Sequence, residues 1–210
     1  MQLILIRHSF SQHWSRGIIA GRSSCPGLTE QGVQQAHLLA QHLRTTGEVN
    51  KDSILLSSPV RRAYQTAEIL ATTLSIEAIV QDANLCEIDP GAAEGLSHED
   101  YQSQYGRFDL PTYPTRPFAP GGETWLEFLA RVGNTLDQIA KQYAGQSVVA
   151  VTHAGFIIAS FLVLFDIPRP GTGTHLEPLP TSLTEWHFSS NRWSLIRFNE
   201  VCHDLLTKQR

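Results

Sequence analysis

Short apolar stretches alternate along this chain with longer segments in which apolar residues recur every three or four positions. The stretches at residues 2–7 and 147–153 are apolar at nearly every position, which is typical of strands buried on both faces of a sheet. Two further strands are predicted at 53–57 and 76–80. Because helical patterns separate the strands, the sequence predicts an α/β fold, a mostly parallel sheet with helices on both faces in three layers.

Amphipathic helices are predicted after the first and second strands. Thr29 is the expected N-cap of the first helix. The buried face of this helix is predicted to hold Val33, Ala36, Ala40 and Leu43. The second helix is expected to use Ser58 as its cap and Pro59 as its first residue. Its buried face is predicted to hold Ala63, Ala67, Leu70 and Leu74.

The segment 82–122 interrupts this alternation. It contains a short helix that is expected to open at Ser97 and a Pro-rich loop at 110–122. Because a long loop inside a compact domain is often functional, we expect an insert around 97–122 to lie over the binding edge of a single domain spanning 1–210. The remaining predicted elements are a helix over 123–143, a buried helix at 156–165 and a C-terminal hairpin formed by SLTEWHF and RWSLIRF.

Composition excludes several classes of protein. A net charge of −4 and the absence of any Lys/Arg run argue against a nucleic-acid groove. Cys25, Cys86 and Cys202 have no CxxC spacing, so they indicate neither a disulfide framework nor a zinc site. The apolar run before Arg7 is too short for a signal peptide, and the run at 156–165 is too short to span a bilayer. We therefore expect a cytoplasmic protein without a membrane partner. The sequence leaves a homodimer open.

Cations and imidazoles follow three of the predicted strands. Arg7 and His8 end the first strand, Arg62 follows the second, and His153 ends the strand before the apolar helix. Because the carboxyl ends of parallel strands meet at one edge of the sheet, we expect these four side chains to converge there. Two guanidinium groups and two imidazoles suit a dianion such as phosphate. Glu87 adds a carboxylate that would be either a salt-bridge partner or a proton donor.

Six motifs, in order and correctly spaced, resemble those of the histidine phosphatase superfamily, the phosphoglycerate mutase-like proteins. They are RH at 7–8, PGLTEQGVQQA at 26–36, SSPVRRAYQTA at 57–67, LCEIDPGAAEG at 85–95, PGGETWLEFLARV at 120–132 and VTHAG at 151–155. The resemblance implies that His8 is the nucleophile that becomes a phosphohistidine. By the same resemblance, Arg7, Arg62 and His153 hold the phosphoryl oxygens, and Glu87 donates the proton.

The resemblance implies a hydrolase of the histidine acid phosphatase type, a phosphomonoesterase that uses no metal or other cofactor on a small phosphate ester. A neutral imidazole would attack phosphorus in line while the fixed cations stabilise its oxygens. The main alternative is a cofactor-dependent phosphoglycerate mutase, an isomerase that uses the same residues. The resemblance also bears on this choice, because mutases of the superfamily generally have more chain between the positions of Glu87 and His153. The short segment between Glu87 and His153 therefore favours hydrolysis. A non-catalytic module that binds a phospho-ligand is a third hypothesis, less favoured because both histidines are present.

The chain departs from the superfamily pattern after His8, where Ser9 replaces the usual glycine. We therefore expect a turn there that accepts any residue. Extra contacts to the substrate are expected from a set of candidates: Ser11, Gln12, Arg22 and Ala154.

Other polar residues in the motifs are predicted to be structural. Arg61 is expected on the exposed surface of its helix, beside the buried Arg62. Glu94 and Glu123 are expected to brace loops or a helix start. The acidic and imidazole side chains at 98–100 are expected to form the solvated first turn of a helix rather than a metal site.

Overall fold

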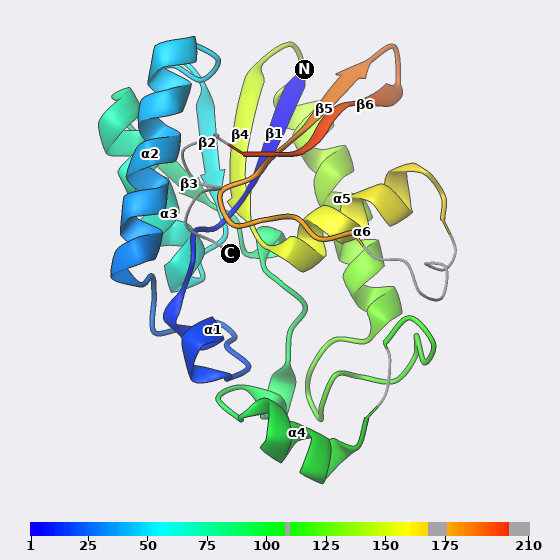
Figure 1. The fold of residues 1–210 in the computed structure, drawn as a ribbon. Helices are drawn as coiled ribbons and strands as arrows, with labels where there is room; N and C mark the ends of the chain where they lie inside the picture. The colour runs from blue at the N-terminus through cyan, green and yellow to red at the C-terminus, as the bar shows by residue number, and fades with distance from the viewer. Residues whose placement is uncertain (108–109, 168–175, 202–210) are drawn as a thin grey trace.

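The computed structural model describes residues 1–107, 110–167 and 176–201, and its centre is a sheet of six strands (Figure 1). The strands lie in the order β3-β2-β4-β1-β5-β6. Their bounds are β1 Gln2–Arg7, β2 Ile54–Ser57, β3 Ile79–Gln81, β4 Ser147–Thr152, β5 Leu183–Ser189 and β6 Arg192–Glu200. Strands β1 to β4 are parallel to one another, and β5 and β6 pair antiparallel to their neighbours. The predicted α/β class with a mostly parallel sheet is confirmed.

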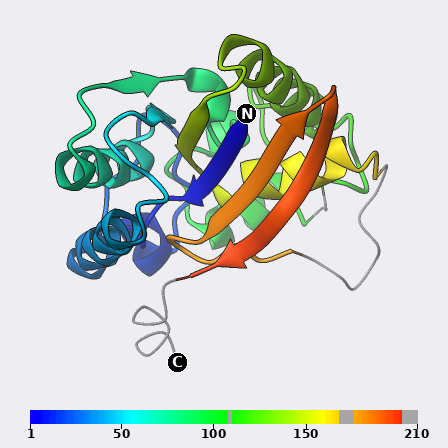
Figure 2. The ribbon, with the colours of Figure 1, turned by 90° about the horizontal axis from the view of Figure 1, so that it is seen from above.

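Helices cover the sheet on both faces. Helices α2 and α3 pack on one face and α5 and α6 on the other, which gives the three predicted layers (Figure 2). The helices are α1 Gln12–Arg16, α2 Glu30–Thr46, α3 Arg61–Leu74, α4 His98–Tyr105, α5 Trp125–Gln142 and α6 Ala154–Leu164, with short 3-10 helices η1 Ala83–Leu85 and η2 Gly91–Ala93.

The continuous apolar run of β1 follows from these two layers. Ile4 and Ile6 point into the core beneath α2 and α3, while Leu3 and Leu5 point into the core beneath α5 and α6. All four side chains are inaccessible to solvent. A strand covered on both faces has no polar side, so its sequence does not alternate.

The C-terminal hairpin is confirmed, and its turn explains its position. Ser190 and Asn191 connect β5 to β6, and both have positive φ angles, 50° and 56°. Two consecutive residues with positive φ give a turn whose twist matches the twist of the paired strands.

Two expectations about element positions are wrong. The third strand begins at Ile79 rather than at residue 76, because the amide of Ile76 closes the end of α3 by bonding to Ala71 O at 3.0 Å. Helix α3 begins at Arg61 rather than at Ser58-Pro59. Ser58 instead extends the edge of β2, where its amide bonds to Val151 O at 2.9 Å.

The buried face of α2 also differs from the prediction at one position. Val33 is 38% exposed. Gln35 is buried in its place, and its side chain bonds to the loop after β1. The other three predicted residues, Ala36, Ala40 and Leu43, are buried as expected.

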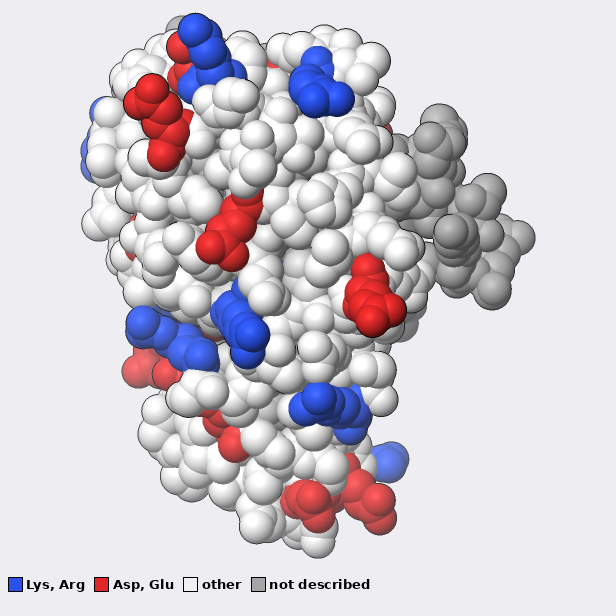
Figure 3. Space-filling view, turned by 90° about the vertical axis from the view of Figure 1, so that its left-hand side faces the viewer, with Lys and Arg blue, Asp and Glu red and all other residues white. Residues whose placement is uncertain are grey.

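Both α1 and α4 lie beyond the carboxyl ends of β1 and β4 (Figure 1). On the face that carries α2, basic and acidic side chains are scattered among uncharged ones, and no basic stripe is visible (Figure 3). No helix in the described residues is long and apolar enough to cross a membrane.

Candidate active site

The four predicted phosphate ligands meet where β1 and β4 end. Arg7 is the last residue of β1, His8 follows it, His153 is the N-cap of α6, and Arg62 comes from the first turn of α3. All four are buried, with at most 7% of each residue exposed. The ring centroids of His8 and His153 lie 5.2 Å apart. As expected, Arg62 is buried and its neighbour Arg61 is exposed.

The partners of His8 assign the protons on its ring. Nδ1 lies 2.8 Å from the carbonyl oxygen of Ser9, which only accepts, so Nδ1 carries the hydrogen. Arg62 Nε donates to His8 Nε2 at 3.0 Å, so Nε2 presents a lone pair. An imidazole whose Nε2 lone pair faces a cation cluster is oriented to attack an electrophile bound among those cations.

His153 is held by partners on both ring nitrogens. Arg62 Nη2 donates to its Nδ1 at 3.1 Å, so Nε2 carries the hydrogen and donates to Ser58 Oγ at 2.9 Å. The hydroxyl of Ser58 in turn donates to Cys86 Sγ at 3.4 Å. Ser58 therefore fixes the ring orientation of His153, a role that the sequence analysis did not assign to it.

Burial and the neighbouring guanidinium groups keep both histidines neutral. Desolvation, followed by the charge of Arg62, lowers the pKa of His8 and of His153 well below the ordinary value of 6.5. Burial also lowers the pKa of Arg7, which Glu87 partly offsets. A neutral imidazole is the form of histidine in which a ring nitrogen can act as a nucleophile.

Three motif residues hold the loop that carries His8. Thr66 Oγ1 accepts from the amide of Ser9 at 3.1 Å, and Gln35 Oε1 accepts from the amide of Phe10 at 3.0 Å. A Cβ atom at Gly32 would lie 1.9 Å from Phe10 O, so only glycine allows α2 to pack this closely. Ser9 is not among the residues with positive φ, which confirms that its turn accepts a residue other than glycine.

Glu87 is held at the mouth of the site by two backbone amides. Its Oε2 accepts from Gly155 N at 2.9 Å, and its Oε1 accepts from Ile88 N at 3.1 Å. A Cβ atom at residue 155 would lie 2.0 Å from Glu87 Oε1. Gly155 therefore leaves the space that this carboxylate occupies.

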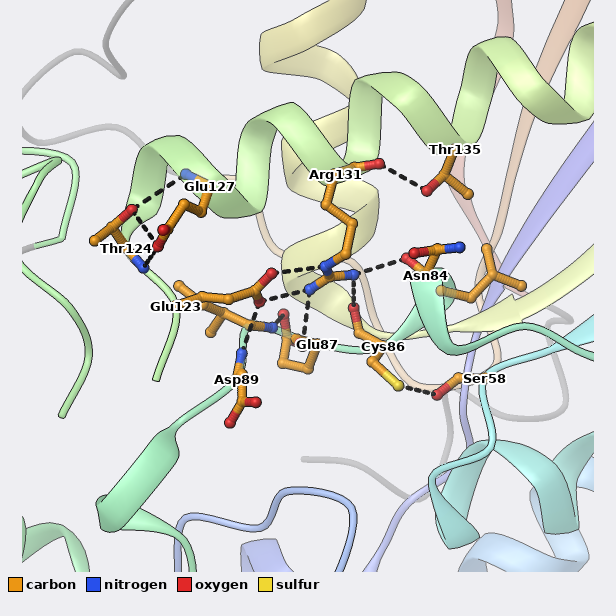
Figure 4. A network of polar contacts seen from close by, with 12 residues as sticks. Ser58, Asn84, Cys86, Glu87, Asp89, Glu123, Thr124, Glu127, Arg131 and Thr135 are labelled. Carbon is orange, nitrogen blue, oxygen red and sulfur yellow. Dashed lines mark hydrogen bonds and ion pairs between the residues drawn. The ribbon is translucent and has the colours of Figure 1, made fainter. Parts of the chain in front are cut away.

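Arg131 braces the loop that contains Glu87 (Figure 4). It donates to both carboxylate oxygens of Glu123 at 2.7 Å and to the carbonyl oxygens of Asn84, Cys86 and Glu87 at 2.7, 3.0 and 3.2 Å. Glu123 also accepts from the amide of Asp89 at 2.9 Å. Glu123 thus braces the loop as predicted. Sequence analysis did not single out Arg131, although it lies within one of the six motifs.

Two hollows open beside these residues. The wide hollow, of about 510 Å³, is lined by Arg7, His8, Arg62 and Glu87 together with Trp14, His98, Phe118 and other residues. The narrow hollow, of about 310 Å³, shares Arg62 and Glu87 with it and continues past Arg22, Glu94 and Arg131. His98 and Phe118 belong to the insert at 97–122, so part of that insert forms a wall of the site. The division of the chain into a single domain stays a prediction.

The additional substrate-binding candidates lie in different places. Ala154 lines the wide hollow, and Arg22 lines the narrow one. The buried hydroxyl of Ser11 bonds to His13 Nδ1, and Gln12 donates to Leu28 O at 3.0 Å. Neither Ser11 nor Gln12 lines either hollow. Their contacts with a substrate stay predictions.

Two of the structural interpretations are confirmed. Glu94 accepts from the amides of Ser23 and Ser24, so it braces a loop. Residues 98–100 form the exposed first turn of α4, which is capped by Ser97. Among the described residues, no group of three or more histidine, cysteine or acidic side chains is placed to hold a metal ion.

Comparisons with known proteins find relatives that match nearly the whole chain. The family model for the histidine phosphatase superfamily (branch 1) matches residues 3–201. The chain is 29% identical over 206 residues to phosphoserine phosphatase 1 of Hydrogenobacter thermophilus, covering 97% of this chain and 94% of that protein. It is 26% identical over 206 residues to a metal-independent phosphoserine phosphatase of Arabidopsis thaliana, covering 96% of this chain and 82% of that protein.

The fold comparison extends over nearly the whole chain. The solved structure of Bacillus stearothermophilus YhfR superposes with a TM-score of 0.82 at 25% identity, covering 96% of this chain and 98% of that one. The chain spans 50% of the length of other curated relatives, three mycobacterial proteins that are 31% identical to it. The family match, together with the site built from its motifs, shows that this chain belongs to the histidine phosphatase superfamily.

Proposed function

We propose that this protein is a phosphomonoesterase of the histidine acid phosphatase type, which hydrolyses a small organic phosphate through a phosphohistidine on His8 and uses no metal. The observation that carries the proposal is the orientation of His8. Its Nδ1–H donates to Ser9 O, and its Nε2 lone pair faces Arg62 at 3.0 Å. A bound phosphoryl group would replace the contact between these two side chains and would lie against Arg7, Arg62 and His153.

The first step forms a bond between His8 Nε2 and phosphorus while the ester P–O bond breaks. The guanidinium groups of Arg7 and Arg62 stabilise the charge that spreads over the phosphoryl oxygens. The departing oxygen takes the electron pair of the ester bond and a proton from Glu87, which lines both hollows.

The second step returns the enzyme to its starting state. Water attacks phosphorus, the Glu87 carboxylate takes a proton from that water, and the P–N bond breaks with its electron pair returning to His8. Inorganic phosphate then leaves. No oxidant, reductant or further co-reactant is needed in either step.

The test is acid-labile labelling of the enzyme by a ³²P-labelled ester, followed with phosphate release. Wild type is expected to label within one turnover and to release phosphate. His8→Ala is expected to do neither, whereas His37→Ala, which removes an exposed imidazole from α2, is expected to do both. Phosphoserine and 3-phosphoglycerate belong among the esters tested. Turnover by His8→Ala would overturn the proposal, and so would isomerisation of 3-phosphoglycerate without phosphate release, which is the activity of a mutase.

A further inference from the structure

We propose that the wide hollow binds the organic part of the ester, and that the substrates of this enzyme are phosphate monoesters of apolar, ring-sized alcohols or phenols. The inference rests on the proposed function, because it places a leaving group beside the phosphoryl site. It goes beyond that function by naming the class of ester.

The position of the reacting side chains places the ester oxygen in the wide hollow. This hollow is lined by His8, which would attack phosphorus, and by Glu87, which would protonate the leaving oxygen. The narrow hollow is not lined by His8 or Arg7. The phosphoryl group and the oxygen that it loses must lie between the nucleophile and the acid, so both lie in the wide hollow. A volume of about 510 Å³ is much larger than a phosphoryl group needs and leaves room for a ring.

The walls beyond the reacting residues are apolar. Trp14, Ile18, Ile19, Ile88, Pro90 and Phe118 line this part of the hollow. The charged side chains among its lining residues are Arg7, Arg62 and Glu87, and each of these already has a role at the reacting centre. An ammonium or carboxylate group on the substrate would therefore lose its water here without meeting a further charged partner.

The imidazole of His13 adds no charge to these walls. Burial lowers its pKa to about 3, and the charges of Arg62 and Arg7 act in the same direction. His13 also bonds through Nδ1 to Ser11 and lies edge-on to Trp14, with ring centroids 6.2 Å apart. Besides burial, the groups that lower the pKa of His13 are Arg62, Arg7 and His98, and the ring of His8 also faces it, with ring centroids 6.1 Å apart. None of these groups stabilises an imidazolium.

Trp14 is positioned to cover a bound ring. It is 59% exposed, yet one part of it packs against the guanidinium carbon of Arg7, 5.7 Å from the ring centroid. Phe118 closes the wall that belongs to the insert, and its ring centroid lies 4.9 Å from that of Tyr101. A ring between Trp14 and Phe118 would remove apolar surface of both from water, which favours binding.

The experiment compares esters whose alcohols are similarly poor leaving groups. Values of kcat/KM for 2-phenylethyl phosphate, ethyl phosphate and phosphoserine are measured by phosphate release. The phenylethyl ester is expected to exceed each of the others by about tenfold or more, the gain from burying a ring. Trp14→Ala and Phe118→Ala are each expected to reduce that ratio severalfold. Phe165→Ala, which removes an exposed ring at the end of α6, is the matched control and is expected to leave the ratio unchanged.

The outcomes separate this inference from the proposed function. Phosphate release from none of the esters would overturn both. Release from all three with equal or lower kcat/KM for the phenylethyl ester would overturn the inference and leave the phosphatase activity standing. An unchanged ratio in both Trp14→Ala and Phe118→Ala would also overturn it. A preference for phosphoserine that is lost in Arg22→Ala would assign the organic group to the narrow hollow instead.

Discussion

Replacing Gly155 by alanine tests whether the carboxylate of Glu87 must lie where the structure places it. Residue 155 is the second residue of α6 and has no positive φ, so the helix itself accepts alanine. The new Cβ would lie 2.0 Å from Glu87 Oε1 and 2.7 Å from Cδ. Because ordinary contacts of this kind need roughly 3.5 Å, the carboxylate has to move by about 1.5 Å.

The displacement is expected to cost activity rather than folding. Glutamate is a flexible side chain, and alanine is favoured over glycine in a helix by about 1 kcal/mol. This gain offsets much of the lost hydrogen bond from Gly155 N to Glu87 Oε2, because such a bond contributes about 0.5–1.5 kcal/mol net. A proton donor misplaced by this distance should slow a step that needs it by about 100- to 10,000-fold.

The assay follows phosphoenzyme formation in single turnovers with an alkyl phosphate and an aryl phosphate. The alkyl ester should be slowed by the full factor, because an alkoxide needs a proton to leave. The aryl ester should change little, because an aryloxide leaves with little assistance. Gly133→Ala, a glycine-to-alanine change within α5 beside Val163, is the matched control and should alter neither rate.

A double mutant separates a displaced acid from general damage. In a Glu87→Gln background the acid is already absent, so adding Gly155→Ala should slow the alkyl ester little further. Equal slowing of both esters by Gly155→Ala, or additive losses in the double mutant, would refute the reasoning.

Three further predictions follow from the same contacts. Because burial lowers the pKa of His8 and His153, these groups bind protons more readily after unfolding. The stability that the two neutral histidines contribute is therefore fully present above pH 6.5 and is lost as the pH falls below that value. At pH 5 the free energy of unfolding should be lower by up to about 2 kcal/mol per histidine. Urea titrations at pH 7.5 and 5 measure this, and greater stability at pH 5 would contradict it. Ser58→Ala leaves His153 Nε2–H without its partner, so the unfolding free energy should fall by about 1–3 kcal/mol, and an unchanged urea midpoint would show that the hydroxyl does not hold the ring. Chelator-treated enzyme should keep its phosphatase activity, whereas activity lost to chelator and restored by a divalent ion would show that the reaction needs a metal.

Local patterns in the sequence are sufficient to predict the layers of the fold and the residues at the centre of the site. The apolar run of β1 predicts burial on both faces because every side chain in it is apolar, and the structure buries Leu3 and Ile4 on opposite faces. The choice of Arg62 over Arg61 follows from its motif, and the burial of the two residues agrees. The positions of strand ends were less predictable. Ile76 is as apolar as a strand residue, but it lies just after α3, and its amide bonds back to Ala71 O of that helix.

The sequence by itself determined the alternation of strands and helices along the chain, the superfamily, and the convergence of Arg7, His8, Arg62 and His153 at the carboxyl ends of parallel strands. Only the tertiary structure decided which nitrogen of each histidine carries a hydrogen, because the partner of His153 Nε2 is Ser58, 95 positions away in the chain. The same holds for Gly155 and Glu87, 68 positions apart, where the lack of a side chain on one residue makes room for the carboxylate of the other. The periodicity of apolar residues predicts which face of an element is buried. Contacts between distant segments depend instead on how the packed layers bring those segments together.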